Sequence, residues 1–274
     1  MLNFSIPKLF KIPKVQMAVA LAVVYVAALF IIKLLSLYQG VVLLSFCLFF
    51  TISFDLLFTY IKIRQLFKPY AAIVSGLIIA LIIDPSAMWY QIAFIAGLAI
   101  ASKNFLRVSG RHIFNPAAFG ILSGQLTLGL SASWWGASFP SIAGHPSILS
   151  FFSLVVLLLP AYVSGYRMKR FYIILTFLLA FTIITSIGLP ISMKSILDKL
   201  VNPGVIFFTV IMLVEPMTSP VGAKKQIIYA IFVAVLVKLI SLLAPGNIFF
   251  TRLIQDSFIS SLLMANAIFF KFRL

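Results

Sequence analysis

The chain has 274 residues, of which 63% are hydrophobic and only 9% are charged, and its formal net charge is +16. This composition excludes an ordinary water-soluble domain. In a soluble protein the positive charge would suggest a nucleic-acid partner. Here the basic residues lie between apolar runs, so membrane topology explains them better and no nucleic-acid partner is expected. Continuous apolar runs also exclude a membrane β-barrel, whose strands alternate in hydrophobicity. The sequence predicts an all-α polytopic membrane protein.

Apolar segments bounded by polar or basic residues follow one another along the whole chain. The first one follows Lys8, Lys11 and Lys14 and resembles a signal peptide. Its apolar run continues to Ile32, which is long for such a peptide, so we read it as a retained helix. The ten predicted helices are roughly 15–35, 39–61, 70–84, 87–102, 115–131, 147–165, 170–189, 203–215, 222–243 and 257–271.

The basic residues predict the orientation of these helices. If the N-terminus is cytoplasmic, 16 of the 21 Lys and Arg residues fall in connections or termini on the cytoplasmic side. Cytoplasmic segments of membrane proteins carry such an excess of positive charge. We therefore expect a multi-pass protein of the inner (cytoplasmic) membrane, in contact with the lipid bilayer, with both termini cytoplasmic. The longest connection, about 132–146, is uncharged and would lie outside.

An internal repeat is also visible. The predicted third and eighth helices both end as an apolar run, an acid and a proline, at Asp84-Pro85 and Glu215-Pro216. Because an offset of five helices reverses the direction of crossing, the single membrane domain 1–274 would contain two inverted five-helix repeats, 15–131 and 147–271. The segment 203–215 would measure only ~20 Å against a hydrocarbon core of ~30 Å. Short, proline-bounded segments of this kind indicate a binding site between repeats.

Polar residues concentrate at the predicted cytoplasmic ends of two short helices. Arg111 and His112 precede Asn115-Pro116, which predicts an N-cap and first helical residue, as does Asn202-Pro203. Glu215 follows the apolar run 203–215. By itself Arg111 reads as a positive-inside anchor.

The intramembrane acids allow two interpretations. Glu215 would either pair with Arg111 or Lys103 in a purely structural role, or bind an ion, a proton or a cofactor, because intramembrane carboxylates are costly and usually functional. Asp55 and Asp84 are the other acids expected in or near the membrane, and either could simply be neutralised by a neighbour. The candidate ion pathway is Asp55, Asp84 and Glu215.

The remaining acidic and aromatic residues have simpler interpretations that involve no binding site. Asp198 and Asp256 are predicted to be solvated loop charges. Trp134 and Trp135, in the connection 132–146, are most simply aromatic residues of the membrane interface. They could alternatively stack on a flavin ring.

Several cofactors are not expected. His112 and His145 are predicted on opposite faces of the membrane, whereas two axial haem ligands must lie at one depth, so neither haem nor a metal site is expected. The lone Cys47 lies in an apolar run. One thiol can form neither an internal disulfide nor a four-cysteine iron–sulfur cluster within the chain.

Three stretches resemble a known family. They are Gly-Arg-His-Ile-Phe-Asn-Pro-Ala-Ala-Phe-Gly at 110–120, Glu-Pro-Met-Thr-Ser-Pro at 215–220 and Leu-Leu-Met-Ala-Asn at 262–266. They resemble the membrane subunit shared by the sodium-translocating NADH:quinone reductase and the Rnf electron-transport complex, the NqrB/RnfD family. The likeness covers the predicted helices three to ten, and the chain would be a short, divergent member.

The resemblance implies a urea-transporter-like bundle that contains non-covalent riboflavin and carries flavin mononucleotide (FMN) esterified to a threonine. Electrons would arrive from other membrane and soluble subunits. They would pass to quinone or, in Rnf, between ferredoxin and NAD, with ion transport coupled to them. The chain would thus be a subunit of a redox-driven translocase and not catalytic alone. Carried onto this sequence, the candidate flavin-binding residues are Lys103, Arg111, His112, Asn115, Thr218, Ser219 and Asn266.

The sequence departs from the family at the site of covalent attachment. The family's Ser-Gly-Ala-Thr motif is expected after the fifth helix, but residues 131–139 read Ser-Ala-Ser-Trp-Trp-Gly-Ala-Ser-Phe and contain no threonine. Ser138 best matches the position of the acceptor. We expect riboflavin or FMN to be bound non-covalently, without covalent FMN.

Two alternative functions belong to other classes. One is a small-solute channel or transporter of urea-transporter-like fold, and the other is a redox-inactive scaffold that binds partner subunits. Charged motifs on the cytoplasmic side fit an electron-transfer subunit better than a pore for neutral solutes.

Overall fold

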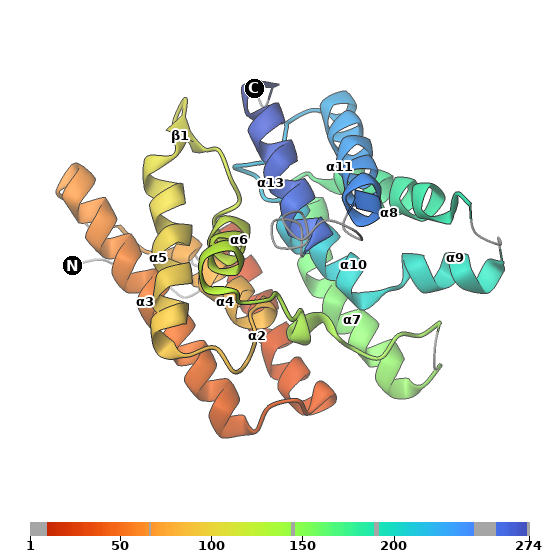
Figure 1. The fold of residues 1–274 in the computed structure, drawn as a ribbon, viewed down its shortest axis with the longest axis horizontal. Helices are drawn as coiled ribbons and strands as arrows, with labels where there is room; N and C mark the ends of the chain where they lie inside the picture. Colours follow the sequence, from red (N-terminus) through yellow and green to blue (C-terminus); the bar gives the residue numbers. More distant parts are fainter. Residues whose placement is uncertain (1–9, 66, 144–145, 189–191, 244–255, 273–274) are drawn as a thin grey trace.

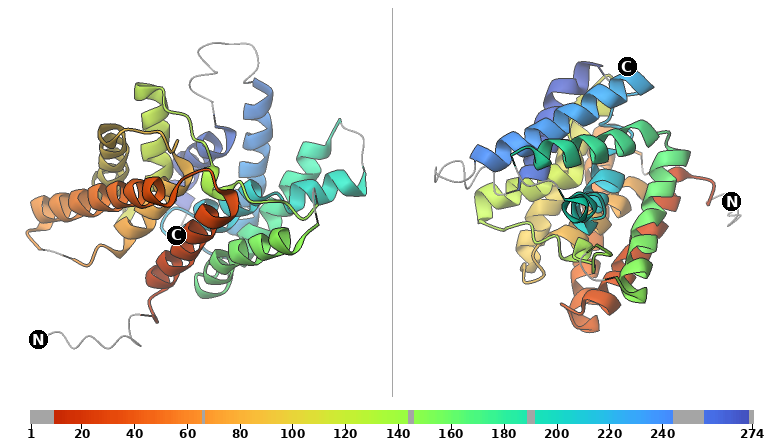
Figure 2. Two further views of the ribbon diagram at one scale, coloured as in Figure 1. Left: turned by 90° about the horizontal axis from the view of Figure 1, so that it is seen from below. Right: turned by 90° about the vertical axis from the view of Figure 1, so that its right-hand side faces the viewer.

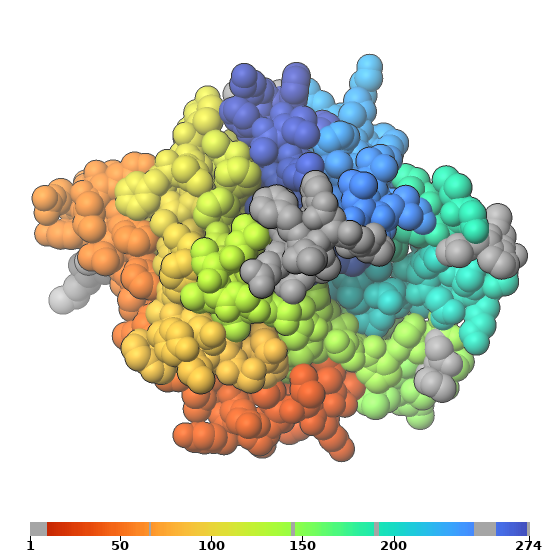
Figure 3. Space-filling view, in the orientation of Figure 1, coloured from red at the N-terminus to blue at the C-terminus, as the bar shows by residue number. Residues whose placement is uncertain are grey.

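The computed structural model describes residues 10–65, 67–143, 146–188, 192–243 and 256–272. In this part of the chain nearly all regular structure is helical, which confirms the predicted all-α class. The N-terminal half of the chain lies on one side of the molecule and the C-terminal half on the other (Figures 1 and 2). Figure 3 shows the two halves packed side by side, red to yellow against green to blue.

Within the described residues, the first half contains five α-helices and a short antiparallel hairpin between the last two helices. Their bounds are α2 Pro13–Ile32, α3 Leu37–Ile63, α4 Tyr70–Ile82, α5 Trp89–Phe105, β1 Arg107–Val108, β2 Arg111–His112 and α6 Pro116–Leu128.

In the described part of the second half, a 3₁₀ turn comes first, and two π-helical segments each continue an α-helix. The elements are η1 Trp135–Ala137, α7 Ile148–Tyr162 with η2 Val163–Arg167, α8 Phe171–Ser186, α9 Met193–Leu200, α10 Pro203–Phe207 with η3 Phe208–Leu213, α11 Ala223–Leu243, and α13 Ser257–Phe269 with η4 Phe270–Phe272.

Helices occupy every apolar segment that the sequence predicted to be helical. Four of the described helices are long and apolar enough to cross a membrane, namely α2, α3, α7 with η2, and α11. A fifth span results if α9 and α10–η3, which meet at a bend of 43°, count as one. Large apolar side chains cover the outer faces, for example Val41 (59% exposed) and Phe151 (63% exposed). Apolar surface of this extent indicates a membrane-embedded protein.

Asparagine and proline start two short helices, as predicted. The Asn115 side chain accepts a hydrogen bond from the Ala118 N–H at the start of α6 (3.1 Å). At the start of α10, Asn202 accepts one from the Val205 N–H, also at 3.1 Å. In both cases the cap leaves one fewer unpaired N–H group at a helix end in apolar surroundings, where an unpaired group is costly.

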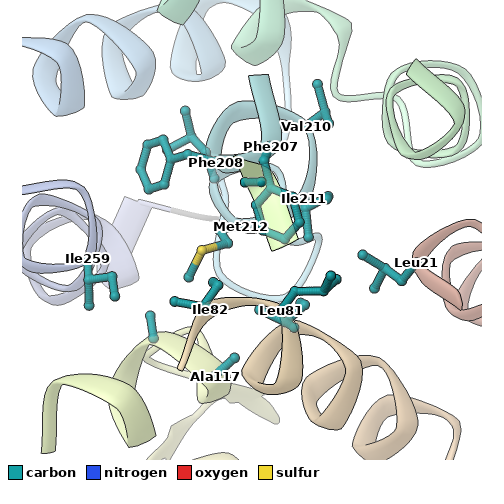
Figure 4. Packing of buried hydrophobic residues seen from close by; sticks show 14 of the residues in the cluster. Leu21, Leu81, Ile82, Ala117, Phe207, Phe208, Val210, Ile211, Met212 and Ile259 are labelled. Carbon is teal, nitrogen blue, oxygen red and sulfur yellow. The ribbon is translucent and has the colours of Figure 1, made fainter. Parts of the chain in front are cut away.

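The core is centred on α4 and on α10–η3, which are shorter than α2, α3, α8 and α11. Leu81, Ile82, Phe207, Phe208 and Met212 are completely buried, and Figure 4 shows several of them packed between the two segments. The longer helices pair around this centre, α3 along α5 in the first half and α8 along α11 in the second. Helices α6 and α13 then pack on α5 and α11, respectively.

The structure corrects one prediction about the connection after α6. Trp135 is 2% exposed, so its assignment to the membrane interface was wrong. Its Nε1–H donates to the Ala80 carbonyl at 2.8 Å, and its ring packs edge-on against Tyr25. Trp134 is half-buried and packs edge-on against Phe207.

The prediction that Asp256 is solvated was also wrong. Its carboxylate is buried, accepts the N–H groups of Phe258 and Ile259 at 2.9 Å to cap α13, and contacts Nε1 of Trp134. Asp198, also predicted to be a solvated loop charge, instead lies half-buried on the helix α9. His145 lies outside the described residues.

Candidate functional site

A cavity of about 510 Å³ opens between α3, α4 and α5 on one side and the end of η3 on the other. Its inner walls are apolar and include Met17, Val74, Ile78, Ile211 and Val214. The polar and charged side chains that line it are Lys14, Asp55, Thr59, Lys62, Lys68, Tyr70, Ser75, Lys103, Asn104, Arg107, His112, Asn115 and Glu215. The cavity therefore combines an apolar interior with a charged region.

The first cluster of charged groups joins α3 and α5. Lys103 Nζ lies 2.8 Å from Asp55 Oδ1, and the two side chains are only 16% and 10% exposed. The same carboxylate oxygen accepts a hydrogen bond from Asn104 Nδ2 at 3.3 Å. The Asn104 carbonyl in turn accepts one from Lys62 Nζ at 2.7 Å. Of the two sequence interpretations of Asp55, this geometry supports the one in which a neighbour neutralises it.

The second cluster joins the hairpin to the segment after η3. His112 Nε2 lies 2.8 Å from Glu215 Oε1, and the Thr218 hydroxyl donates to Glu215 Oε2 at 3.2 Å. The sequence suggested Arg111 or Lys103 as the structural partner of Glu215. Instead Glu215 contacts His112, which is charged only when its ring is protonated, and Lys103 pairs with Asp55.

The tight turn of the β1–β2 hairpin determines where His112 lies. Arg107 pairs with His112 and Val108 with Arg111, which leaves a two-residue turn at Ser109 and Gly110. Both turn residues have positive φ, 49° and 78°. Two-residue hairpin turns of this type require positive φ at both positions, and glycine adopts it without strain.

Two arginines hold the peptide that follows Glu215. Arg111 and Arg170 each donate a hydrogen bond from Nη2 to the Pro216 carbonyl, at 3.3 and 3.2 Å. Arg170 comes from the start of α8 and is only 4% exposed. Cations are favourable near the carbonyl end of a helix, here the end of η3. No signal in the sequence distinguished Arg170 from the neighbouring basic residues Arg167 and Lys169.

Asn115 connects the start of α6 to the end of η3. Besides its capping bond, its Nδ2 donates to the Met212 carbonyl at 3.2 Å. Helix η3 is π-helical over its whole length, and π-helical turns in proteins are often found at functional sites. Asn115 thus lines the cavity and also supports the segment that carries Glu215.

The sequence candidates divide into three groups. Lys103, His112 and Asn115 line the cavity together with Asp55 and Glu215. Behind its wall, Arg111 and Thr218 contact the segment 215–216, as described above.

Ser219 also lies behind the wall, where its hydroxyl donates to the Glu215 carbonyl at 2.7 Å. Asn266 lies elsewhere, buried within α13, and its Nδ2 donates to the Leu262 carbonyl at 2.7 Å. Ser138 is also not part of the cavity lining, and its hydroxyl donates to the Trp134 carbonyl at 3.1 Å.

Asp84 follows the C-terminal end of α4, whereas Tyr70, at the N-terminal end of this helix, lines the cavity. Its Oδ1 accepts hydrogen bonds from the N–H and hydroxyl of Ser86, at 2.8 and 2.7 Å. Between Ile78, which lines the cavity, and Asp84 come the fully buried Leu81 and Ile82. Phe207 and Phe208 pack in the same region from α10 and η3 (Figure 4). We call Leu81, Ile82, Phe207 and Phe208 the apolar plug.

Sequence reasoning missed several basic residues of the cavity. Lys14, Lys62, Lys68 and Arg107 were interpreted only as positive-inside anchors, yet all four line it. They lie near the ends of different helices, and chain order alone does not show that these ends meet. Within the described ranges, no group of three or more His, Cys, Asp or Glu side chains comes together as a metal site would need.

Comparison with models of known protein families found no match, and no curated protein sequence matches the chain.

Proposed function

We propose that the chain is a membrane subunit of a flavin-dependent, ion-translocating oxidoreductase complex of the NqrB/RnfD kind. It would hold riboflavin or FMN non-covalently in the cavity between α3, α4, α5 and η3. One observation carries the proposal. Glu215 lies far along the chain from Lys103, His112 and Asn115, yet all four meet at one cavity. His112, Asn115 and Glu215 also belong to two of the motifs that resemble this family.

The residues present fit a flavin. The volume of about 510 Å³ lies within the range of ~300–1,000 Å³ that is usual for ligand pockets. A flavin has an apolar tricyclic body and a polar edge that both donates and accepts hydrogen bonds. Met17, Val74 and Ile78 offer apolar walls for the body, whereas Lys103 and Asn115 offer donors to the polar edge. A bound flavin would supply the electron transfer, as cofactors generally supply such chemistry.

The helix arrangement supports the finer membrane architecture, ten spans in two inverted repeats. The pairing of α3 with α5 has a counterpart in the pairing of α8 with α11, five apolar segments later. The starts of α6 and α13 also correspond, because a side chain caps each, Asn115 in one case and Asp256 in the other. With the positive-inside pattern, both termini would lie on the cytoplasmic side of the inner membrane.

The proposal assigns electron donors and acceptors to other subunits. The described residues form one helix bundle with short connections, so ferredoxin, NAD or quinone would interact through membrane and soluble partners. Asp55 and Glu215 remain candidates for the ion path at the cavity, with Asp84 at its far end. Because the apolar plug fills the space between the cavity and Asp84, ion transport would require α4 or η3 to move.

The alternatives receive less support. A channel for small neutral solutes would not need the charged clusters around Asp55 and Glu215, and the apolar plug closes the route between the two ends of α4. A scaffold without a redox role would need no cavity of ligand size. Neither alternative explains why two of the family-like motifs meet at the cavity.

The absorbance spectrum of the full chain, purified in mild detergent, tests the proposal. A flavin band at close to one flavin per chain is expected. A colourless protein that transports a neutral solute in liposomes would favour the channel instead. A colourless protein without transport that retains partner subunits would favour the scaffold.

A further inference from the structure

The charge around the cavity is unbalanced. Among the described residues that line it, the cations Lys14, Lys62, Lys68, Lys103 and Arg107 outnumber the carboxylates Asp55 and Glu215 by three. Both carboxylates already face a basic side chain, Lys103 in one case and His112 in the other. The carboxylates of the lining thus do not neutralise its positive charge.

The cations gather on one part of the lining. Lys14 lies in the first turn of α2, Lys62 in the last turn of α3, and Arg107 in β1, two residues after the end of α5. The interior beyond them is formed by apolar residues such as Ile78 and Ile211 from the middle of α4 and η3. The lining therefore has a basic mouth and an apolar interior.

Membrane topology alone accounts for basic residues at helix ends, but not for their position along a cavity. A positive-inside anchor needs only to reach the lipid headgroups. Lys62 instead donates a hydrogen bond to the Asn104 carbonyl beside the Asp55–Lys103 pair, and its ammonium group has two further N–H donors. Lys14, Lys62 and Arg107 are exposed, and cations around the opening of an apolar cavity favour binding of an anion there because opposite charges attract, with an attraction that salt screens.

We infer that the cavity binds an amphiphilic anion. Its phosphate or carboxylate group would lie at the mouth among Lys14, Lys62 and Arg107, and its apolar or aromatic body would extend toward Ile78 and Ile211. For a flavin ligand, this inference rests on the proposed function and makes it more specific. It predicts that the cavity prefers a flavin that bears a phosphate over an uncharged flavin. An anionic phospholipid offers the same chemistry from the bilayer.

FMN and riboflavin provide a matched pair of probes, since they share the isoalloxazine ring and differ in the phosphate. The purified full chain in mild detergent is titrated with each, and quenching of flavin fluorescence reports binding. A hydrogen bond to a charged partner changes an equilibrium constant by roughly tenfold or more. We expect FMN to bind about tenfold more tightly at low salt, with most of this preference lost near 1 M salt, where the screening length falls to ~3 Å.

Three variants locate the effect. Lys62→Gln and Arg107→Gln should each reduce the preference for FMN, and gel filtration checks that both remain folded. The amide of Lys62→Gln retains a donor for the Asn104 carbonyl, so the fold of this variant should persist. Lys224→Gln removes the same charge from the exposed start of α11, outside the cavity lining, and should leave the preference unchanged.

The possible results test the inference and the flavin proposal separately. Equal affinities for FMN and riboflavin would overturn the inference and leave the flavin proposal standing. If neither flavin binds, native mass spectrometry compares phosphatidylglycerol with phosphatidylcholine on the same variants. Selective retention of phosphatidylglycerol that Lys62→Gln weakens would support the inference, with a lipid as the anion, and overturn the flavin proposal. Equal retention of the two lipids would overturn both.

Discussion

Removing the charge of Asp55 should destabilise the helix bundle strongly. The ion pair with Lys103 has an N–O distance of 2.8 Å, and its side chains are 10% and 16% exposed, so solvent screens it little. At this distance and an effective dielectric constant of ~20, the attraction amounts to about 6 kcal/mol before desolvation. Breaking buried pairs in this way typically costs about 3–5 kcal/mol. We expect Asp55→Asn to cost about 3 kcal/mol, since Asn still offers an acceptor to Lys103.

Equilibrium unfolding in mixed detergent micelles, followed by the loss of helical circular dichroism, measures this change. The double variant Asp55→Leu with Lys103→Met removes both charges and should return to within about 1 kcal/mol of the wild type, because no unpaired charge remains. Asp84→Asn, whose carboxylate accepts hydrogen bonds from Ser86, is a matched control with a smaller expected cost. A loss below about 1 kcal/mol in Asp55→Asn, or a double variant no better than the single one, would refute the reasoning.

Other predictions concern single contacts and the proposed topology. Asn115→Ala removes the cap of α6 and the bond to η3, and should lower the free energy of unfolding by about 1–2 kcal/mol in the same micelle assay. Gly120→Ala would place a methyl group against a carbonyl oxygen of α5, and should cost about 1–3 kcal/mol. Reporter fusions after Arg167 and after Lys225 should both be cytoplasmic, and an external signal after Lys225 would contradict the proposed topology. A denaturing gel under ultraviolet light should show no fluorescent band for this chain. A band that Ser138→Ala abolishes would demonstrate covalent flavin.

The helices were predictable because their signal is local. Continuous apolar runs with basic ends located α2, α3 and α11 to within a few residues, and the Asn-Pro pairs at 115 and 202 marked the starts of α6 and α10 correctly. Helix α9 was missed because it has only eight residues and mixes Lys and Asp with apolar residues. A segment of that kind is not distinguished from a polar connection by hydropathy alone.

The pairing of charges was less predictable, because it depends on how helix ends meet in space. The sequence placed Glu215 and His112 on the same side, yet the choice between His112, Arg111 and Lys103 as partner depends on the β1–β2 hairpin. Lys103 pairs with Asp55 because α3 packs along α5, and no local sequence pattern predicts that these two helices are neighbours. The same holds for Trp135, whose burial beneath α4 contradicts the usual position of tryptophan in membrane proteins.

The central claim is that this cavity holds a flavin, and a cavity-filling substitution tests it most directly. Val74→Trp places a large side chain on the apolar wall of the cavity, whereas Val41→Trp makes the same change on the exposed face of α3. The measurement is the flavin-to-protein ratio after purification in mild detergent. The account predicts close to one flavin per chain in the wild type and in Val41→Trp, and a severalfold lower ratio in folded Val74→Trp. Equal flavin content in all three proteins, or none in the wild type, would contradict it.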